Sequence, residues 1–263
     1  MQLRVDGDTR LLVLTGAGVS AESGVPTFRD AGGLWENHPV EKVATLEGFE
    51  ADPRLVWRFY SERRRRAKQV LPNPGHAALA EAEARMGDRF LLVTQNVDGL
   101  HRRAGSVRLV EMHGNIFETS CTGCRREPFA DDLEYLGDPP RCEECAAHGR
   151  TGLLRPAVVW FGEMLDPMRL HRVSSFIDES RGSRLVFLAV GTSGLVYPAA
   201  GMVLQARAAG AEAWLVNVEP PDNVRAFHHF AQLPTGHHIG HAAGLFHTAD
   251  LHLGDQFAIT VHQ

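Results

Sequence analysis

The sequence predicts an α/β protein built on a doubly wound parallel sheet, with a small metal-binding module inserted into it. Two observations lead to this prediction. Short apolar runs rich in Val and Leu alternate with segments of helical pattern, which is typical of parallel strands covered by helices on both faces. The four cysteines of the 263-residue chain form two Cys-x2-Cys pairs in the one segment that interrupts this alternation.

Five runs are expected to be buried parallel strands, because each is apolar and is flanked by glycine or a polar turn. They cover residues 11–14, 90–93, 109–112, 185–190 and 214–218. Three helices are expected between them. Two begin where a capping residue precedes a proline, at Asp52 and at Asn73, and end near residues 70 and 86. The third is rich in alanine and covers residues 198–209.

Composition limits the classes of function. A net charge of −5 and a pI near 6.3 argue against a general nucleic-acid binder. No apolar run approaches the length of about 20 residues that spans a membrane, and no apolar targeting segment precedes the first strand. The arginines at residues 63–66 are expected to form a solvated helix face. We therefore expect a soluble, monomeric protein of the cytoplasm that contacts neither nucleic acid nor membrane.

The cysteine pairs predict one structural zinc ion. Cys121 and Cys124 are separated from Cys142 and Cys145 by seventeen residues, a spacing typical of tetrahedral four-thiolate sites. A disulfide framework and a redox-active Cys-x2-Cys are the alternatives. A chain of this length buries its own core without disulfides, and a redox pair needs no second Cys-x2-Cys. We expect a zinc-ribbon insert at residues 115–154, a main domain at residues 1–114 and 155–263, and a helical module at about 31–72.

A glycine-rich turn follows the first predicted strand. Gly16, Gly18 and Ala21 form the pattern Gly-x-Gly-x-x-Ala, which lets backbone N–H groups approach a pyrophosphate at the start of a helix. This pattern alone is weak, because many junctions between a strand and a helix need such glycines. No clear acidic residue follows at the end of a second strand. A Rossmann-like domain is therefore expected, but an ordinary dehydrogenase is doubtful.

A set of longer motifs continues from this turn along the chain. They read GAGVSAESGVPTFR at 16–29, TQNVDGLH at 94–101, MHG at 112–114, RPAVVWFGE at 155–163, GTS at 191–193 and NVE at 217–219. These motifs, in this order, resemble those of the sirtuins, which are NAD-dependent protein deacylases, and the resemblance extends from about residue 11 to residue 220. The resemblance implies an enzyme that uses NAD as co-substrate, acts on acylated lysine side chains of proteins, and releases nicotinamide and O-acyl-ADP-ribose.

The resemblance implies that His113 is the general base, a role that suits an imidazole near neutral pH. A histidine that only caps the preceding strand is the alternative. Asn96 and Asp98 match residues that hold the nicotinamide and its ribose, although Asn-x-Asp also shapes ordinary turns. The remaining residues implied to bind NAD are Gly16, Ala17, Gly18, Ser20, Phe28, Arg29, Trp35, Gln95, Val97, Gly191, Thr192, Ser193, Asn217, Val218 and Glu219.

The resemblance also concerns the acylated substrate. Val158 and Phe161 belong to a segment expected to pair with the substrate peptide as an added strand; it is otherwise a buried edge strand. Tyr60 and Arg63 are neighbours on one helix face and match the pair found in sirtuins that prefer succinyl- and malonyl-lysine, the bacterial cobalamin-associated type among them. A structural role for both is the alternative. Ala44 matches a small residue that widens the acyl pocket.

The resemblance ends near residue 220. Residues 228–263 hold eight of the fourteen histidines, and residues 226–263 contain no Lys or Arg. A divergent tail, a frameshifted end and a metal-binding tail are the alternatives. The histidine spacings suit no particular metal site, so we assign the tail no ligand and favour an end outside the family pattern, of the kind that a frameshift produces. We expect the tail to pack poorly, to leave the main sheet complete at residue 218, and to enclose the adenine side of NAD incompletely. The leading function is lysine desuccinylation, demalonylation and deacetylation. A protein ADP-ribosyltransferase and a non-catalytic NAD-binding regulator are the alternatives.

Overall fold

The computed structural model describes residues 2–26, 34–35, 38–124, 126–192, 199–233 and 257–260. Its centre is a sheet of six parallel strands: β2 Thr9–Thr15, β5 Phe90–Thr94, β6 Leu109–Glu111, β10 Arg184–Val190, β11 Glu212–Asn217 and β12 His229–Gln232. Their order in the sheet is β12-β11-β10-β2-β5-β6. The chain builds β2, β5 and β6 outwards, then returns to build the other half, as in a Rossmann fold. The predicted doubly wound fold is confirmed.

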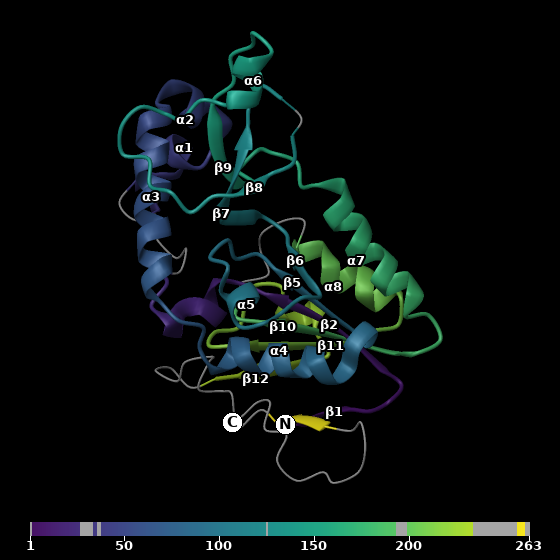
Figure 1. Ribbon diagram of the computed structural model, residues 1–263. Coiled ribbons are helices and arrows are strands. Elements are labelled where there is room, and N and C mark those ends of the chain that lie inside the picture. Colours follow the sequence, from purple (N-terminus) through teal and green to yellow (C-terminus); the bar gives the residue numbers. More distant parts are fainter. Residues whose placement is uncertain are drawn as a thin grey trace.

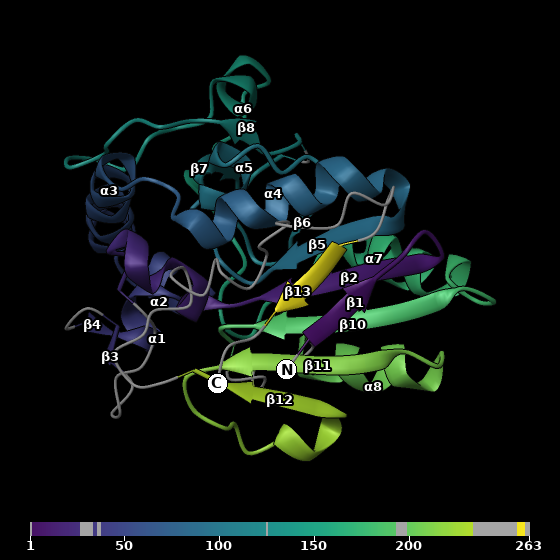
Figure 2. The same ribbon diagram turned by 90° about the horizontal axis from the view of Figure 1, so that it is seen from below.

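Helices cover both faces of this sheet (Figures 1 and 2). Leu11 and Val13 of β2 pack into a core with α4 Pro74–Met86, whereas Leu12 and Leu14 pack into a second core with α7 Pro167–Glu179 and α8 Ala199–Ala208. This alternation follows from the period of two along a strand. Because both faces are buried, the strands are continuous apolar runs, which is why the sequence predicts their positions well.

The predicted helix starts at Asp52 and Asn73 are confirmed. Asp52 accepts a hydrogen bond of 2.9 Å from the backbone N–H of Leu55 and caps α3 Pro53–Gln69. Asn73 caps α4 and its own N–H donates to Nδ1 of His76, forming a reciprocal capping box. The start of α7 carries the same signal, because Asp166 caps it directly before a proline. This helix was not predicted from the sequence.

A second layer stands beside the carboxyl ends of the main sheet (Figure 1). It contains the helices α1 Val40–Val43, α2 Leu46–Ala51, α3 and α6 Glu143–Ala147, and an antiparallel sheet of β7 Gly114–Cys121, β8 Phe129–Ala130 and β9 Leu154–Val158. Helix α3 packs on this sheet through Trp57, whose indole Nε1–H donates to the carbonyl of Leu154 at 2.9 Å. Helix α3 and the antiparallel sheet therefore share one core.

The expectation of a solvated arginine face at residues 63–66 is wrong for Arg64. Arg65 and Arg66 are exposed and pair with Glu62, but the Arg64 side chain is completely buried. Its guanidinium donates to three backbone carbonyls, to the Thr119 hydroxyl and to the Asp131 carboxylate. A guanidinium has five N–H donors and can satisfy several carbonyls at once, so its hydrogen bonds compensate for its burial.

The expectation that the sheet ends at residue 218 and that the tail packs poorly is wrong for residues 229–233. Strand β12 pairs with β11, and Ala231 and Leu233 are buried in the main core. The His229 ring stacks on Trp214 at 4.0 Å between centroids. Further on, β13 Phe257–Thr260 pairs with β1 Gln2–Val5. Strand β12 is short, contains His229 and Gln232 and lies at the edge of the main sheet, so it lacks the continuous apolar pattern by which the other strands of that sheet were predicted.

The remaining short elements are η1 Ala17–Ser23, β3 Leu34–Trp35, β4 His38–Pro39, η2 Gly87–Arg89, α5 Leu100–Arg103 and η3 Val224–Ala226. No helix within the described ranges has both the length and the apolar character needed to span a membrane.

Candidate active site

A cavity of about 940 Å³ opens where the strands β2, β5, β10 and β11 end. Ligands of open α/β sheets bind at this edge, beside the point where the strand order reverses. Val218 does not line the cavity. Phe28, Arg29 and Ser193 lie outside the described residues, as does the side chain of Trp35. The other sequence-predicted NAD and substrate residues all line it: Gly16, Ala17, Gly18, Ser20, Tyr60, Arg63, Gln95, Asn96, Val97, Asp98, His113, Val158, Phe161, Gly191, Thr192, Asn217 and Glu219.

The loop after β2 and the loop after β10 both line the cavity and approach each other closely. Glycine is required in both loops, because the two backbones leave no room for side chains. The N–H of Gly16 donates to the Val190 carbonyl at 3.1 Å, and the N–H of Gly18 donates to the Gly191 carbonyl at 2.8 Å. A Cβ atom on Gly16 would lie 2.8 Å from the carbonyl oxygen of Gly191, and a Cβ atom on Gly18 would lie 2.8 Å from the Cα atom of Gly191. This bare backbone surface fits the pyrophosphate of a dinucleotide.

Amide side chains tie the loops after β2, β5 and β10 together. Gln95 donates from Nε2 to the Thr192 hydroxyl at 2.8 Å. Asn96 donates from Nδ2 to the Gly16 carbonyl at 3.1 Å and to the Ser20 hydroxyl at 3.0 Å. The amides therefore hold their positions through contacts with the backbone and hydroxyls of the neighbouring loops.

Asp98 lies beside these amides and is almost completely buried. Burial raises the pKa of its carboxyl, while hydrogen bonds from the Leu100 N–H and the Ser20 side chain oppose the rise. A buried carboxyl held by two donors suits a ligand with hydroxyl or amide donors.

His113 lies between β6 and β7 at the wall of the cavity. Its Nδ1 is 3.0 Å from the Gln95 carbonyl oxygen, which can only accept a hydrogen bond. The proton of the neutral imidazole therefore resides on Nδ1, and Nε2 retains its lone pair. Burial lowers the pKa of His113, with a smaller lowering by the nearby Arg169, and the bond to Gln95 opposes this. The ring is accordingly neutral and able to accept a proton at neutral pH.

The segment after β9 lines the cavity beside His113. The N–H of Val159 donates to the His113 carbonyl at 2.9 Å, and the N–H of Phe161 donates to the Ala44 carbonyl at 2.9 Å. These bonds fix the segment between His113 and Ala44, which lies between α1 and α2, and Phe161 remains half exposed. An extended backbone at the rim of a cavity is suited to pairing with a peptide.

Tyr60 and Arg63 of α3 line the cavity together with Ala44. Tyr60 is fully buried, which raises the pKa of its phenol to about 12, so that the hydroxyl retains its proton. The Arg63 guanidinium lies 5.5 Å from the centre of the Phe59 ring. A phenol and a guanidinium three residues apart on one helix form a site that can receive a carboxylate.

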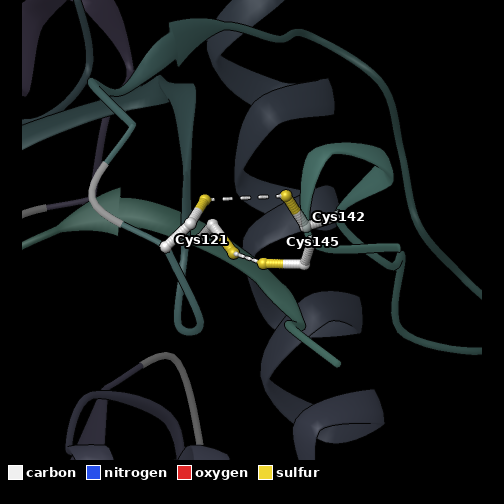
Figure 3. Close-up of side chains that lie close together, drawn as sticks. Cys121, Cys142 and Cys145 are labelled. Atoms are coloured by element: carbon white, nitrogen blue, oxygen red, sulfur yellow. Dashed lines mark hydrogen bonds between the residues drawn. The ribbon is translucent and has the colours of Figure 1, made fainter. Parts of the chain in front are cut away.

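The four cysteines meet between β7 and α6. Cys121 Sγ lies 3.6 Å from Cys145 Sγ, and Cys124 Sγ lies 3.8 Å from Cys142 Sγ (Figure 3). All four Sγ atoms are within 4.8 Å of one another. Thiolates about 2.3 Å from a tetrahedral zinc ion lie about 3.8 Å apart, so this donor set fits zinc. The disulfide alternative is wrong, because the cysteines are free.

Some residues that line the cavity were not predicted from the sequence as site residues. Trp160, Leu165 and Leu170 also line the cavity. Trp160 lies within a recognised motif, but the sequence does not reveal that its side chain reaches α3. The two leucines lie in and before α7, the helix that was overlooked.

Comparison with known proteins places this fold and site in a family. Residues 16–198 match the family model described as "Sir2 family". This match covers well over half of the chain, so the chain belongs to the Sir2 family. The resemblance of the motifs to sirtuins is thereby confirmed.

Among its relatives, the "NAD-dependent protein deacylase" of Pasteurella multocida (strain Pm70) is 47% identical over 80% of this chain and 86% of its own length. The protein of the same description from Escherichia coli (strain K12) is 48% identical over 80% of this chain and 72% of its own length. A solved Sir2 homologue in complex with NAD has a TM-score of 0.77 at 35% identity, covering 90% of this chain and 87% of its own. A Sir2 complex with a p53 peptide and NAD+ has a TM-score of 0.72 at 29% identity, covering 89% and 90%.

Proposed function

We propose that this protein is an NAD-dependent protein-lysine deacylase that prefers acidic acyl groups. The observation that carries the reaction class is the placement of the His113 imidazole. Its Nδ1–H is fixed on the Gln95 carbonyl, which leaves Nε2 as a proton acceptor at the wall of a dinucleotide-sized cavity. The relatives described as NAD-dependent protein deacylases, and the related Sir2 complexes with NAD and with a peptide, support this proposal.

We assign the cavity residues as follows. The backbones of Gly16 and Gly18 receive the pyrophosphate, Asn96 and Asp98 bind the nicotinamide and its ribose, and Asn217 is assigned to the adenosine ribose. When bound, NAD would supply a ribose that gives up nicotinamide and finally carries the acyl group on one of its hydroxyl oxygens, while water supplies the atoms that release the free lysine amine. His113 Nε2 accepts a proton from a ribose hydroxyl, while Gln95 keeps the imidazole oriented through its carbonyl.

The segment 158–161 is assigned to the substrate peptide, whose backbone would add to it as a strand. Tyr60 and Arg63 are assigned to the far end of the acyl group. A succinyl or malonyl group ends in a carboxylate, which can accept hydrogen bonds from both side chains, whereas an acetyl group has no such acceptor. Removing a hydrogen bond to a charged group costs about 1.5–3 kcal/mol, or roughly 10- to 150-fold in kcat/KM.

The acyl preference is tested by Arg63→Met with peptides that differ only in the acyl group. We expect kcat/KM for succinyl-lysine to fall roughly 10- to 150-fold more than kcat/KM for acetyl-lysine. The matched control is Arg58→Met, which removes an exposed arginine from the same helix and should leave both values unchanged. An equal loss for the two substrates in Arg63→Met would mean that Arg63 has a structural role and that the enzyme is better described as a deacetylase.

We further propose that residues 115–154 form a zinc-ribbon insert in a main domain of residues 1–114 and 155–263, with a helical module at about 31–72. One zinc ion held by Cys121, Cys124, Cys142 and Cys145 would link β7 to α6 without contacting substrate. A monomer in the cytoplasm that binds neither nucleic acid nor membrane remains a prediction. Gel filtration with light scattering tests the oligomeric state.

A further inference from the structure

Trp160 reaches from the segment after β9 to the phenol of Tyr60. Its indole Nε1–H lies 3.0 Å from the Tyr60 oxygen, and the two ring centroids are 6.4 Å apart. Both side chains are buried, with 2% and 0% of their surface exposed, and both line the cavity. The bond therefore joins two walls of the acyl end of the cavity.

The direction of this hydrogen bond follows from chemistry. An indole N–H can only donate, so the Tyr60 oxygen must accept, and the O–H of Tyr60 must donate to a different acceptor. From this geometry we infer that Trp160 is a positioning residue: it orients the Tyr60 hydroxyl as a donor to the distal carboxylate of an acidic acyl group. This inference rests on the acyl preference proposed above and assigns to Trp160 a share in that specificity.

The indole is itself held in place. The Arg155 guanidinium lies 3.5 Å from the Trp160 ring centre and makes two hydrogen bonds to the Glu163 carboxylate, of 2.5 and 2.9 Å. The same carboxylate accepts a hydrogen bond of 2.8 Å from the backbone N–H of Trp160. Phe49 packs against the indole with 5.3 Å between centroids. A side chain contacted from several directions loses little further freedom when the substrate binds, which is the requirement for an orienting group.

Trp57 offers a matched comparison. It is on the same helix as Tyr60, is equally buried, and donates its indole N–H to a backbone carbonyl at 2.9 Å, but it does not line the cavity. Trp57→Phe and Trp160→Phe therefore remove the same chemical group from the same core. A purely structural role of Trp160 predicts similar effects of the two changes on succinyl- and acetyl-lysine alike.

The test measures the ratio of kcat/KM for succinyl-lysine to kcat/KM for acetyl-lysine in the full-length protein with NAD. We expect Trp160→Phe to lower this ratio by about 2- to 13-fold, the effect of one hydrogen bond, and Trp57→Phe to leave it unchanged. Tyr60→Phe should lower the ratio at least as much, and adding Trp160→Phe to Tyr60→Phe should lower it no further.

An unchanged ratio in Trp160→Phe, or a further loss in the double variant, would overturn the inference. If Tyr60→Phe leaves the ratio unchanged while Arg63→Met lowers it, the proposed acyl preference stands and the inference about Trp160 is overturned. If neither variant lowers the ratio, the acyl preference itself fails, so the two failures are distinguishable. If Trp160→Phe does not fold, Phe49→Leu decides, because it loosens the indole without removing its N–H and without altering the cavity lining. A lowered ratio in Phe49→Leu would support the inference, and an unchanged ratio would contradict it.

Discussion

Replacing Arg64 by methionine is expected to destabilise the protein by about 3–5 kcal/mol, the usual cost of removing one partner of a buried ion pair. The change deletes the bonds that the guanidinium makes to the carbonyls of Ile116, Glu118 and Leu133 and to the Asp131 carboxylate. Asp131 is 9% exposed and would lose its only cationic partner among the described residues. The Thr119 hydroxyl, at 2.6 Å, would still donate to this carboxylate, which favours the lower half of the range.

Urea unfolding of the purified variants measures this cost directly. The matched control is Arg65→Met, because Arg65 is the next residue on α3 but is exposed. Exposed ion pairs contribute at most about 1 kcal/mol, so Arg65→Met should unfold close to the wild type. If the unfolding free energies of the two variants lie within about 1 kcal/mol of each other, the reasoning that Arg64 joins α3 to β7 is refuted.

Four further outcomes are expected. His113→Ala should lower kcat by about 10²- to 10⁴-fold while calorimetry still detects NAD binding; normal turnover in a folded variant would exclude His113 as the base. Because the His113 pKa is lowered, kcat/KM should rise with pH through a value below the usual 6.5, and a midpoint above 6.5 would contradict the neutral imidazole. Cys142→Ser should lower the zinc content measured by metal analysis from one per chain and destabilise β7 and α6, whereas a metal-free wild type would refute the site. Burial lowers the pKa of His76 to about 4 and that of His101 well below 6.5, so the NMR signals of both rings should not titrate between pH 7 and 5. Because both pKa values are lower in the folded than in the unfolded protein, the free energy of unfolding should decrease as the pH falls below 6.5. Titration of either ring near pH 6.5 would contradict its burial.

The main sheet could be predicted from the sequence because its strands are buried on both faces. Continuous apolar runs such as that of β10 have no other common explanation in an alternating α/β chain. Strand β12 could not be predicted in this way. It contains His229 and Gln232 and lies at the edge of the sheet. Part of an edge strand faces solvent, so its side chains need not all be apolar.

The candidate site was predictable where motifs carry the chemistry and not where tertiary contacts do. Four cysteines with ligand spacing and a histidine before a glycine are visible in the sequence. The burial of Arg64 is not visible, because the carbonyls that it binds come from residues 52 to 69 positions further along the chain. The bond from Trp160 to Tyr60 spans 100 residues and depends equally on the folded structure.

The proposed activity removes acyl groups from lysine at the expense of NAD, and analysis of the reaction products decides whether the protein has it. The full-length protein is incubated with NAD and a mixed panel of succinyl-, malonyl- and acetyl-lysine peptides, and all products are followed by mass spectrometry. We predict one nicotinamide and one O-acyl-ADP-ribose for each lysine freed, with succinyl and malonyl peptides consumed before acetyl peptides. ADP-ribose attached to protein would instead indicate a transferase, and intact peptides with unchanged NAD would indicate a non-catalytic binder. Either result would contradict the proposed deacylase activity.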